Sequence, residues 1–465
     1  MKHLESVKRI IVLQLCLLGI VVQTAMYGYV WLSVYKDIMY NTWFRTFYFK
    51  GYVLLFAIYF LLLLFFTAMY GGLKLGYLKA FDVFFSQAFS LLFVNVISYL
   101  QISLLSLKLV NAGPMLLLFL AQVAFSAVWT FLCQRFYSHL FPPKNLLLIS
   151  GDRPLDDILQ KFAERKDKYT IAKCMREDVG REVLEQEIMQ RYDGVILWDL
   201  STVMRNKLLK FCYSNGVRVY MMPKIPDIIV QGATQLHLFD TPIIFTREYV
   251  MSFEQRFAKR LIDVVCSLIL IIVASPFMLI TAIAIKCYDG GPVLYKQIRC
   301  TKDMREFAIL KFRSMRTDAE KDGVARLASK NDSRITPIGK FIRKVRIDEL
   351  PQLFNILKGD MSFIGPRPER PEIIQQYLEE MPEFTFRTKV KAGLAGYAQV
   401  YGKYNTTPYD KLKLDLIYIE NYSVWMDLKL MLLTLKILFQ PDSTEGIDEN
   451  QITAMRQMKE EEDKN

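Results

Sequence analysis

The chain has 465 residues, of which 52% are hydrophobic and 23% are charged, and its formal net charge is +12. This composition is too apolar for an ordinary soluble protein and too charged for a pure transporter, so it predicts a chain with both membrane and cytosolic parts. The positive charge suits lipid headgroups, nucleotides or phosphates, and because no RNA- or DNA-binding motif accompanies it, no nucleic acid partner is expected.

Four long apolar runs open the chain, over residues 10–34, 51–70, 81–110 and 113–133. Each reaches or nearly reaches the roughly 20 residues that a membrane-spanning helix needs. Basic residues are modestly enriched on the side that faces the cytosol when the N-terminus is inside, as the positive-inside rule requires. We therefore predict an α-helical membrane bundle of four transmembrane helices over 1–144, which returns the chain to the cytosol.

The next region, 145–247, is predicted to be a Rossmann-like α/β domain. The short apolar runs NLLLIS, GVILWD and VRVYMM alternate with amphipathic stretches at 155–165 and 182–191, a pattern typical of a parallel sheet covered by helices. The first run is followed by SGDRP, which lacks the G-x-G-x-x-G of a dinucleotide-binding loop. A regulatory, assembly or scaffolding role is therefore favoured over nucleotide binding.

A fifth apolar stretch, 261–285, contains Ser275 and Pro276 past its middle. Proline removes a backbone donor and clashes with the preceding turn, so it kinks or breaks a helix. One interpretation is a kinked spanning helix, which the residue pattern alone favours. The other is a re-entrant helix over about 259–286, in which Ser275 and its neighbours satisfy the freed carbonyls. A fifth crossing would export the basic region that begins at Lys286, which argues for the re-entrant form.

Histidine and cysteine offer little chemistry. The three histidines, His3, His139 and His237, have no partner at metal-ligand spacing, and the seven cysteines include no C-x-x-C pair. Such cysteines are typical of buried or incidental thiols in a reducing compartment. A Ser-His-Asp or zinc hydrolase is therefore not expected, and catalysis would depend on carboxylates and a hard, oxygen-liking metal.

Two acids, Asp348 and Glu349, stand side by side in RIDELPQLFNIL among many cations. Because Pro351 is tolerated in a first helical turn, the pattern places Asp348 at or near an N-cap and Glu349 in the first turn. Such acids can simply stabilise a helix end. Alternatively, a helix N-terminus preceded by cations is an anion site that would bind phosphates and hold Asp348 ionised, with one acid attacking phosphorus and the other holding Mg²⁺.

Arg367 lies between prolines in GPRP, residues 365–368. The prolines form a stiff mount for a guanidinium that can grip phosphate in bidentate fashion. An ordinary proline-rich turn is the alternative interpretation of the same four residues.

Ordered blocks from 259 to 439 resemble the bacterial sugar transferases, which are monotopic polyprenol-phosphate phosphoglycosyltransferases. These blocks are KRLIDVVCSLILIIVASPF, GPVLYKQIR, ILKFRSM, ITPIGKFIRKVRIDELPQLFNILKGDMSFIGPRPE, GLAGYAQVYGKYNT and LDLIYIENYSVWMDLKLMLLTLKILF. With four spans and an α/β domain before them, they resemble the large members that start capsule, exopolysaccharide or O-antigen synthesis. The resemblance implies an α+β monotopic catalytic domain over 248–440 with a re-entrant membrane helix, followed by an acidic, disordered tail over 441–465.

The resemblance also implies a reaction, the transfer of a sugar-1-phosphate from a UDP-sugar to undecaprenyl phosphate with release of UMP; UDP-glucose or UDP-galactose is favoured. Asp348 would be the nucleophile that carries a covalent phosphosugar, and Glu349 would coordinate Mg²⁺. The residues expected to bind substrate phosphates are Arg343, Arg367, Lys311 and Arg313. Ser275 and Pro276 match the family's membrane helix break, which favours the re-entrant form.

The implied location is the inner or plasma membrane of a bacterial cell, with a multi-pass chain and a cytosolic catalytic domain. Membrane lipids are expected partners, and assembly into a homo-oligomer is compatible with this arrangement. Two alternatives stay open. A polytopic transferase with its site among membrane helices would need acids between the spans, where only Asp37 and Asp82 occur. A catalytically inert, membrane-anchored regulator or assembly protein is the other, and the intact pair Asp348 and Glu349 argues against it.

The chain departs from the family pattern at two places. The hairpin RCTKDMREF lacks the glycines common there, so a different turn must close it, and RIDEL has Arg346 where SLDEL is commoner. Asp415 and Tyr418 lie in the recurrent block LDLIYIEN, where packing and substrate contact are equally good interpretations.

Overall fold

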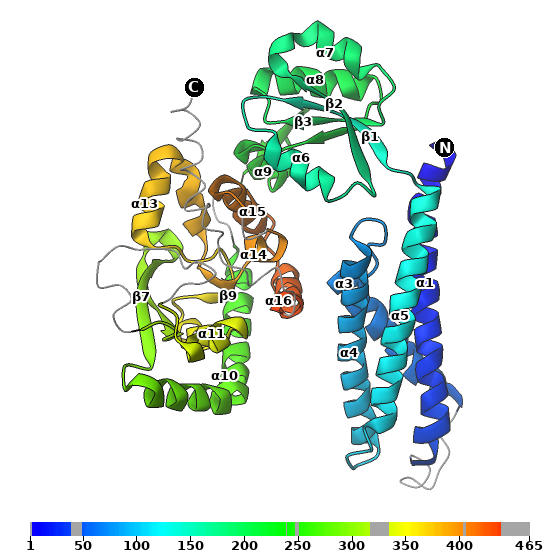
Figure 1. Cartoon of the computed structure of the whole chain (residues 1–465), viewed down its shortest axis with the longest axis vertical. Coiled ribbons are helices and arrows are strands. Elements are labelled where there is room, and N and C mark those ends of the chain that lie inside the picture. The colour runs from blue at the N-terminus through cyan, green and yellow to red at the C-terminus, as the bar shows by residue number, and fades with distance from the viewer. Residues whose placement is uncertain are drawn as a thin grey trace. The chain divides into compact units, whose positions relative to one another are not determined.

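A computed structural model of the chain describes residues 2–38, 49–238, 240–246, 251–316, 334–402 and 406–438 (Figure 1). It divides into two compact units, Met1–Met222 and Pro223–Asn465, which are considered separately below. The acidic tail expected over 441–465 lies outside the described residues.

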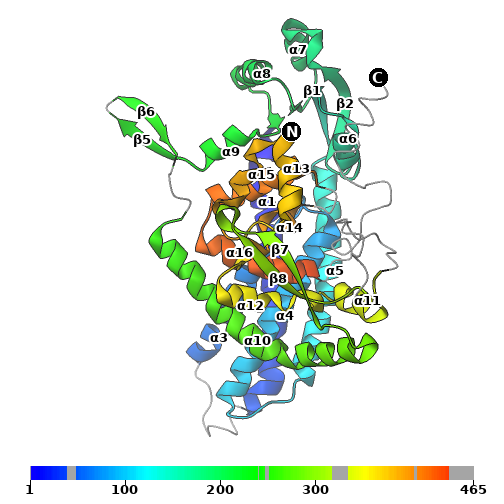
Figure 2. The same cartoon turned by 90° about the vertical axis from the view of Figure 1, so that its left-hand side faces the viewer.

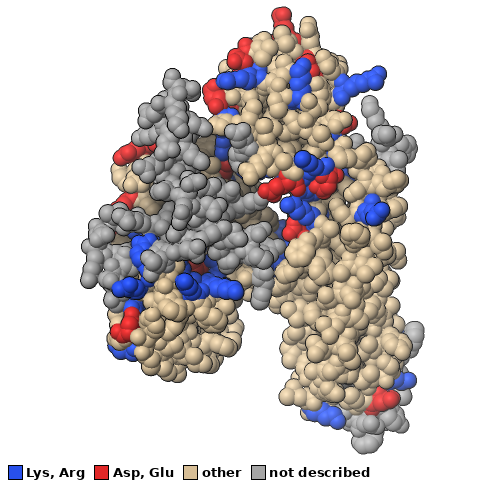
Figure 3. All heavy atoms as spheres, in the orientation of Figure 1, with Lys and Arg blue, Asp and Glu red and all other residues tan. Residues whose placement is uncertain are grey.

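Long apolar helices form the first part of unit 1. They are α1 (Lys2–Val30), which continues into the π-helical turn Trp31–Tyr35, α3 (Phe49–Tyr70), α4 (Ala80–Leu105) and α5 (Gly113–Leu140). All four are long and apolar enough to cross a membrane, and Figure 3 shows an almost uncharged face along them. The four predicted helices are confirmed, although the third ends at Leu105 rather than at residue 110, because the chain turns through Leu107 at φ 54°.

A buried polar network ties these four helices together. The Gln122 side-chain amide donates to the Tyr59 hydroxyl at 2.9 Å and to the Gln23 carbonyl at 3.0 Å, and it accepts from Asn95 at 2.8 Å. The Gln23 amide donates in turn to Ser126 at 2.7 Å. Because hydrocarbon offers no other partners for polar groups, this network specifies how the helices pack.

The rest of unit 1 is a parallel sheet with the strand order β2-β1-β3-β4. Its elements are β1 (Lys144–Ser150), α6 (Asp156–Ala163), β2 (Tyr169–Arg176), α7 (Arg181–Ile188), β3 (Gly194–Trp198), α8 (Thr202–Ser214) and β4 (Val219–Met221). The predicted α/β region is confirmed at this level. β2 was not predicted, because it is an edge strand whose residues are mostly exposed, whereas the buried β1 and β3 are continuous apolar runs.

Unit 2 begins with residues that the sequence analysis assigned to the middle domain. Its elements are α9 (Ile225–Gln231), β5 (Thr234–Leu238), β6 (Thr241–Phe245), α10 (Phe253–Asp289), β7 (Leu294–Cys300), β8 (Glu306–Phe312), α11 (Pro337–Lys344), α12 (Gln352–Lys358), β9 (Ser362–Ile364), α13 (Pro371–Glu380), β10 (Gly393–Ala395), α14 (Tyr397–Tyr401), α15 (Pro408–Glu420) and α16 (Val424–Leu438). Ile225 and Ile228 of α9 are buried in the same core as Leu412 and Leu416 of α15.

The antiparallel hairpin β7–β8 closes without glycine, as expected from RCTKDMREF. Its strands pair from Leu294 with Phe312 to Cys300 with Glu306. A 3-10 turn over Lys302–Met304 joins them, with Asp303 at φ 55° and Met304 at φ 59°. Two non-glycine residues in the left-handed region therefore replace the usual glycines, at a cost in backbone energy.

α10 is a single helix of 37 residues, yet it bends sharply along its length (Figure 2). Pro276 lies inside the helix and leaves the carbonyl of Ile272, four residues earlier, without its usual donor. The Ser275 hydroxyl donates to this carbonyl at 2.8 Å. The expectation that Ser275 satisfies the freed carbonyl is therefore confirmed, although the helix bends rather than breaks.

Both ends of α10 are held by the same globular unit. Near its start, Lys259 reaches the Ile364 carbonyl at 2.9 Å and Asp427 at 2.7 Å. Near its end, Ile285 packs with Phe312 and Ile342. A straight helix of 37 residues would separate its ends by about 55 Å, so the bend is what lets one unit hold both. The apolar side chains around the bend are largely exposed, and Figure 3 shows few charges on this surface.

Candidate active site

Asp348 and Glu349, hereafter the acidic dyad, lie on a 3-10 turn, Ile347–Glu349, between α11 and α12. α12 begins only at Gln352, and Pro351 is the residue that precedes it. The prediction that Asp348 caps a helix is therefore wrong. Arg346 begins the turn instead, at φ 56° in the left-handed region. An arginine in this conformation costs free energy, and such strain clusters at functional sites.

The position of this turn depends on how closely α11, the helix before it, packs against the backbone of Ser314. Thr336 is the N-cap of α11, and its hydroxyl accepts from the backbone N–H of Gly339 at 2.9 Å. A Cβ on Gly339 would lie 1.9 Å from the carbonyl oxygen of Ser314. Only glycine therefore allows α11 to pack this closely against the residues that follow β8. α11 then carries the chain directly into the dyad.

Two cations contact Glu349. Lys311 Nζ on β8 lies 3.9 Å from Oε1, and Arg367 Nη2 lies 3.3 Å from the same oxygen. Both cations therefore approach the same carboxylate oxygen of Glu349. The structure thus brings Lys311 and Arg367, both predicted from the sequence, to the acidic dyad.

The two acids differ in their pKa values. Burial, and then the charge of Glu349, raise the pKa of Asp348 to about 6, against the opposing effect of Lys311, Arg343 and Arg346. Burial acts in the same direction on Glu349, but Arg367, Lys311 and Arg346 outweigh it and lower the pKa of Glu349 to about 2. Burial and the neighbouring carboxylate therefore outweigh the cations in setting the direction of the shift, and with a pKa of about 6 Asp348 is still mostly ionised at neutral pH.

The other predicted phosphate ligands lie in different surroundings. Arg343, at the end of α11, is close enough to lower the pKa of Asp348. Arg313 is not brought to the dyad, because its guanidinium forms a bidentate pair with Asp289 and donates to the Pro292 carbonyl at 2.7 Å. In this structure Arg313 fastens the end of α10 to β8.

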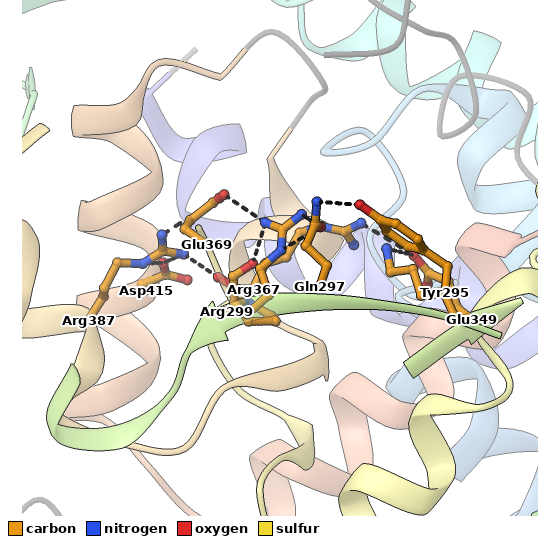
Figure 4. A network of polar contacts seen from close by, with 10 residues as sticks. Tyr295, Gln297, Arg299, Glu349, Arg367, Glu369, Arg387 and Asp415 are labelled. Atoms are coloured by element: carbon orange, nitrogen blue, oxygen red, sulfur yellow. Dashed lines mark hydrogen bonds and ion pairs between the residues drawn. The ribbon is translucent and has the colours of Figure 1, made fainter. Parts of the chain in front are cut away.

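Beyond Arg367, a chain of polar contacts continues across unit 2 (Figure 4). Arg387 pairs with the buried Asp415 at 2.8 Å and approaches Glu369 to 3.8 Å. Arg299 approaches Glu369 from the other side, at 3.6 Å. Glu369 therefore lies between two guanidinium groups, next to the segment that presents Arg367.

Comparisons with known proteins identify the family. A family model described as bacterial sugar transferase matches residues 254–441. The UDP-glucose:undecaprenyl-phosphate glucose-1-phosphate transferase of Caulobacter vibrioides is 38% identical over 190 residues, which are 40% of this chain and 71% of that protein. The chain belongs to the bacterial sugar transferase family.

Other relatives of this sugar transferase differ in the sugar they are named for. The UDP-N-acetylgalactosamine-undecaprenyl-phosphate N-acetylgalactosaminephosphotransferase of Aeromonas hydrophila is 44% identical over 255 residues, which are 53% of this chain and 59% of that protein. The UDP-glucose:undecaprenyl-phosphate glucose-1-phosphate transferase of Klebsiella pneumoniae is 39% identical over 210 residues, 44% of this chain and 43% of that protein. The sugar transferase thus spans about half the length of these curated relatives.

The sequence analysis of the sugar transferase missed Arg299, Glu369 and Arg387 as neighbours of the site. No local pattern marks them, because they come from β7, the segment before α13 and the 3-10 turn Pro382–Lys389. For Asp415 the structure favours the packing interpretation, because its side chain is 1% exposed and paired with Arg387. Tyr418 is also buried, and its hydroxyl donates to Asp427 at 2.7 Å.

No ready-made metal cage accompanies the dyad. Within the described ranges, no group of three or more His, Cys, Asp or Glu side chains could hold a metal ion. A metal at the dyad would therefore need oxygen ligands from a substrate or from water in addition to the protein's carboxylates, which is the ordinary situation for Mg²⁺.

Proposed function

We propose that this sugar transferase moves a sugar-1-phosphate from a UDP-sugar to undecaprenyl phosphate and releases UMP, as the first membrane step of a polysaccharide pathway. The observation that carries the proposal is the dyad itself. A half-buried carboxylate with a pKa of about 6 lies beside one with a pKa of about 2, among the charges of Lys311, Arg343, Arg346 and Arg367. Relatives named for this type of reaction support it.

Asp348 is the proposed nucleophile. One carboxylate oxygen attacks the β-phosphorus of the UDP-sugar, and the bond from that phosphorus to the bridging oxygen breaks, so UMP leaves with the electron pair. The phosphosugar is then held on Asp348. The terminal phosphate oxygen of undecaprenyl phosphate attacks the same phosphorus and displaces the carboxylate, which restores the enzyme and completes a ping-pong cycle.

The cations around the dyad have the proposed task of binding the diphosphate. Arg367 is about half exposed, so its guanidinium can form a bidentate contact with a phosphate. Lys311, 21% exposed, lies beside it, and Arg343 approaches from α11. Burial lowers the pKa of Lys311 against the opposing effect of Glu349, because the ammonium group is poorly solvated. An anionic substrate would stabilise the charged form of this lysine.

The residues present fit a Mg²⁺ ion, which we propose as cofactor. Glu349 is a carboxylate with a pKa of about 2, so it is ionised and able to bind a cation, and Asp348 is adjacent. When bound, the ion would offset negative charge on the diphosphate and the leaving group. Treatment with EDTA is expected to stop UMP release, and restored Mg²⁺ to recover it.

α10 is proposed to be a re-entrant membrane helix. Its exposed apolar bend and its two ends, both held by unit 2, support this form over a spanning helix, which would place its ends on opposite sides of a bilayer about 30 Å thick. Unit 2 would then lie in the cytosol of a bacterial cell, at the inner or plasma membrane. There it would meet a water-soluble nucleotide sugar and the phosphate of a lipid whose tail stays in the leaflet.

The α/β part of unit 1 is proposed to be Rossmann-like. Its strand order β2-β1-β3-β4 and parallel pairing support this assignment. The turn after β1 contains Gly151, at which a Cβ would lie 2.2 Å from the Asp199 carbonyl oxygen, so this glycine serves close packing with the turn after β3. A regulatory or assembly role is therefore proposed, rather than nucleotide binding through a glycine-rich loop.

Measurement of UMP release tests the proposed function. Purified protein is incubated with undecaprenyl phosphate, Mg²⁺ and, in separate reactions, UDP-glucose, UDP-galactose or UDP-N-acetylgalactosamine. Asp348→Asn is expected to abolish both UMP release and the phosphosugar adduct seen by mass spectrometry. Asp360→Asn is the matched control, because Asp360 is a buried acid of the same unit that pairs with Arg305. Full activity of Asp348→Asn would contradict the proposal.

Cysteine labelling tests the topology of α10. Single cysteines at positions 255 and 290, in a chain otherwise free of reactive cysteine, are both expected to react with an impermeant reagent added to inside-out vesicles. Labelling of position 290 only in right-side-out vesicles would support a spanning helix instead.

A further inference from the structure

Two arginines hold the backbone that presents Arg367. Arg387 Nη2 donates to the carbonyl of Arg367 at 3.0 Å, and Arg299 Nη1 donates to the next carbonyl, that of Pro368, at 3.1 Å. Both carbonyls belong to the short segment between β9 and α13. Figure 4 shows the two guanidinium groups on this segment, with Glu349 at the far end of the row.

Each of these arginines is itself held by other side chains. Arg387 is 5% exposed, and its guanidinium donates to Asp415 and approaches Glu369. Arg299 donates to the Gln297 side-chain oxygen at 2.6 and 3.0 Å and approaches the other oxygen of Glu369. Arg387 is buried, and its guanidinium already contacts Asp415, Glu369 and the Arg367 carbonyl. It is therefore not expected to bind a substrate directly.

The side chain of Arg367 needs such support. It is 45% exposed, and its contact with Glu349 is a single one at 3.3 Å. A half-exposed arginine keeps most of its rotamer freedom unless its backbone aims it. Pro366 and Pro368 on either side fix their own φ angles, so the direction of the Arg367 carbonyl decides how this segment runs. Arg387 holds that carbonyl.

We infer that Arg387 and Arg299 are positioning residues that act through Arg367. They fix two consecutive carbonyls and so place the Arg367 guanidinium beside Glu349, where it meets the diphosphate. This inference rests on the proposed function for its chemistry. Its physical content is a coupling: the contribution of Arg387 exists only while Arg367 has its guanidinium.

A double-mutant cycle measures this coupling. Arg387→Lys keeps the positive charge beside Asp415 but has no planar fork that reaches both Asp415 and the Arg367 carbonyl. It is expected to lower kcat/KM for the UDP-sugar about tenfold in the wild-type background and less than twofold in the Arg367→Ala background. Equal losses in the two backgrounds would overturn the inference, because a purely structural effect does not depend on the Arg367 side chain.

Arg260→Lys is the matched control. The Arg260 guanidinium also donates to two backbone carbonyls, those of Ile356 and Leu357, each at 2.7 Å, but neither carbonyl belongs to the segment that presents Arg367. Its substitution is expected to have the same effect in both backgrounds. Rates are normalised to folded protein from thermal unfolding, and the same cycle with the less buried Arg299→Lys carries the test if Arg387→Lys folds poorly.

The same cycle run on UDP affinity separates this inference from the proposed function. UDP binding is measured by calorimetry for wild type, both single variants and the double variant, in Mg²⁺. If wild type releases no UMP, the proposed function fails, and the affinity cycle still decides the coupling. Loss of UDP affinity in Arg387→Lys that vanishes in the Arg367→Ala background supports the inference; additive losses overturn it.

Discussion

Sugar-phosphate transfer is expected to slow about tenfold when the pH falls from 7 to 5, because the nucleophile becomes protonated. The pKa of Asp348 is about 6, raised mainly by burial and then by the charge of Glu349. A single group with this pKa is about 91% ionised at pH 7 and about 9% ionised at pH 5, a ratio of about ten. Only the ionised carboxylate can attack phosphorus, so the ratio of rates follows the ratio of these fractions.

The structure also predicts the shape of this pH profile and how to move it. The pKa of Glu349 is about 2, so Glu349 stays ionised throughout this range and the acidic limb has the slope of a single proton. Lys311→Met removes a cation that lowers the pKa of Asp348. The limb is therefore expected to move to higher pH in the residual activity of this variant.

Initial rates of UMP release at UDP-sugar concentrations below KM give kcat/KM, which reports on the free enzyme. The measurements use buffers of constant ionic strength, with thermal unfolding at each pH as a control for intact protein. A flat profile between pH 5 and pH 7, or a limb that moves to lower pH in Lys311→Met, would refute the reasoning.

Three further predictions concern stability. Lys259→Met is expected to cost about 3 kcal/mol, because it leaves Asp427, 4% exposed, without its cation; the thermal midpoint is expected to recover in part when Asp427→Leu is added. Arg313→Ala is expected to lower the thermal midpoint through loss of the Asp289 pair, and an unchanged KM for the UDP-sugar would contradict its predicted phosphate contact. Asp348→Asn is expected to stabilise the protein at pH 8 by up to about 3 kcal/mol and to have little effect near pH 4. The reason is that the pKa of this carboxyl rises from 3.8 to about 6 on folding. Such a group stabilises the folded state at low pH, and this contribution is lost as the pH rises through 6.

The sequence was most informative where chemistry and periodicity are local. The apolar runs predicted the four helices of unit 1 because each run is by itself about as long as a membrane-spanning helix needs to be. The pair Asp348 and Glu349 drew attention because two adjacent acids directly follow a cluster of cations. Ser275 and Pro276 predicted both the bend in α10 and the hydroxyl that satisfies the freed carbonyl, since proline acts only four residues back along the chain.

Local reasoning failed at the dyad itself. It treated Asp348 as a helix cap kept ionised by its basic neighbours. The structure has a separate 3-10 turn there, which begins at a left-handed Arg346, and burial that outweighs those cations. Burial is a property of the folded unit. The direction of the Asp348 pKa shift could therefore not be obtained by counting the neighbouring charges in the sequence.

The sequence by itself determined the long apolar helices and the acidic dyad, because these depend on residue types close together in the chain, and its ordered blocks over 259–439 carried the resemblance to the family. Only the tertiary structure decided which cations meet the dyad. Lys311 and Arg367 reach Glu349, whereas Arg313, two residues after Lys311, turns to Asp289. Two residues that are two positions apart in a strand would share a face, yet Lys311 and Arg313 meet different partners. Those partners come from segments that are distant in the sequence. Pairings of that kind exist only after the chain has folded.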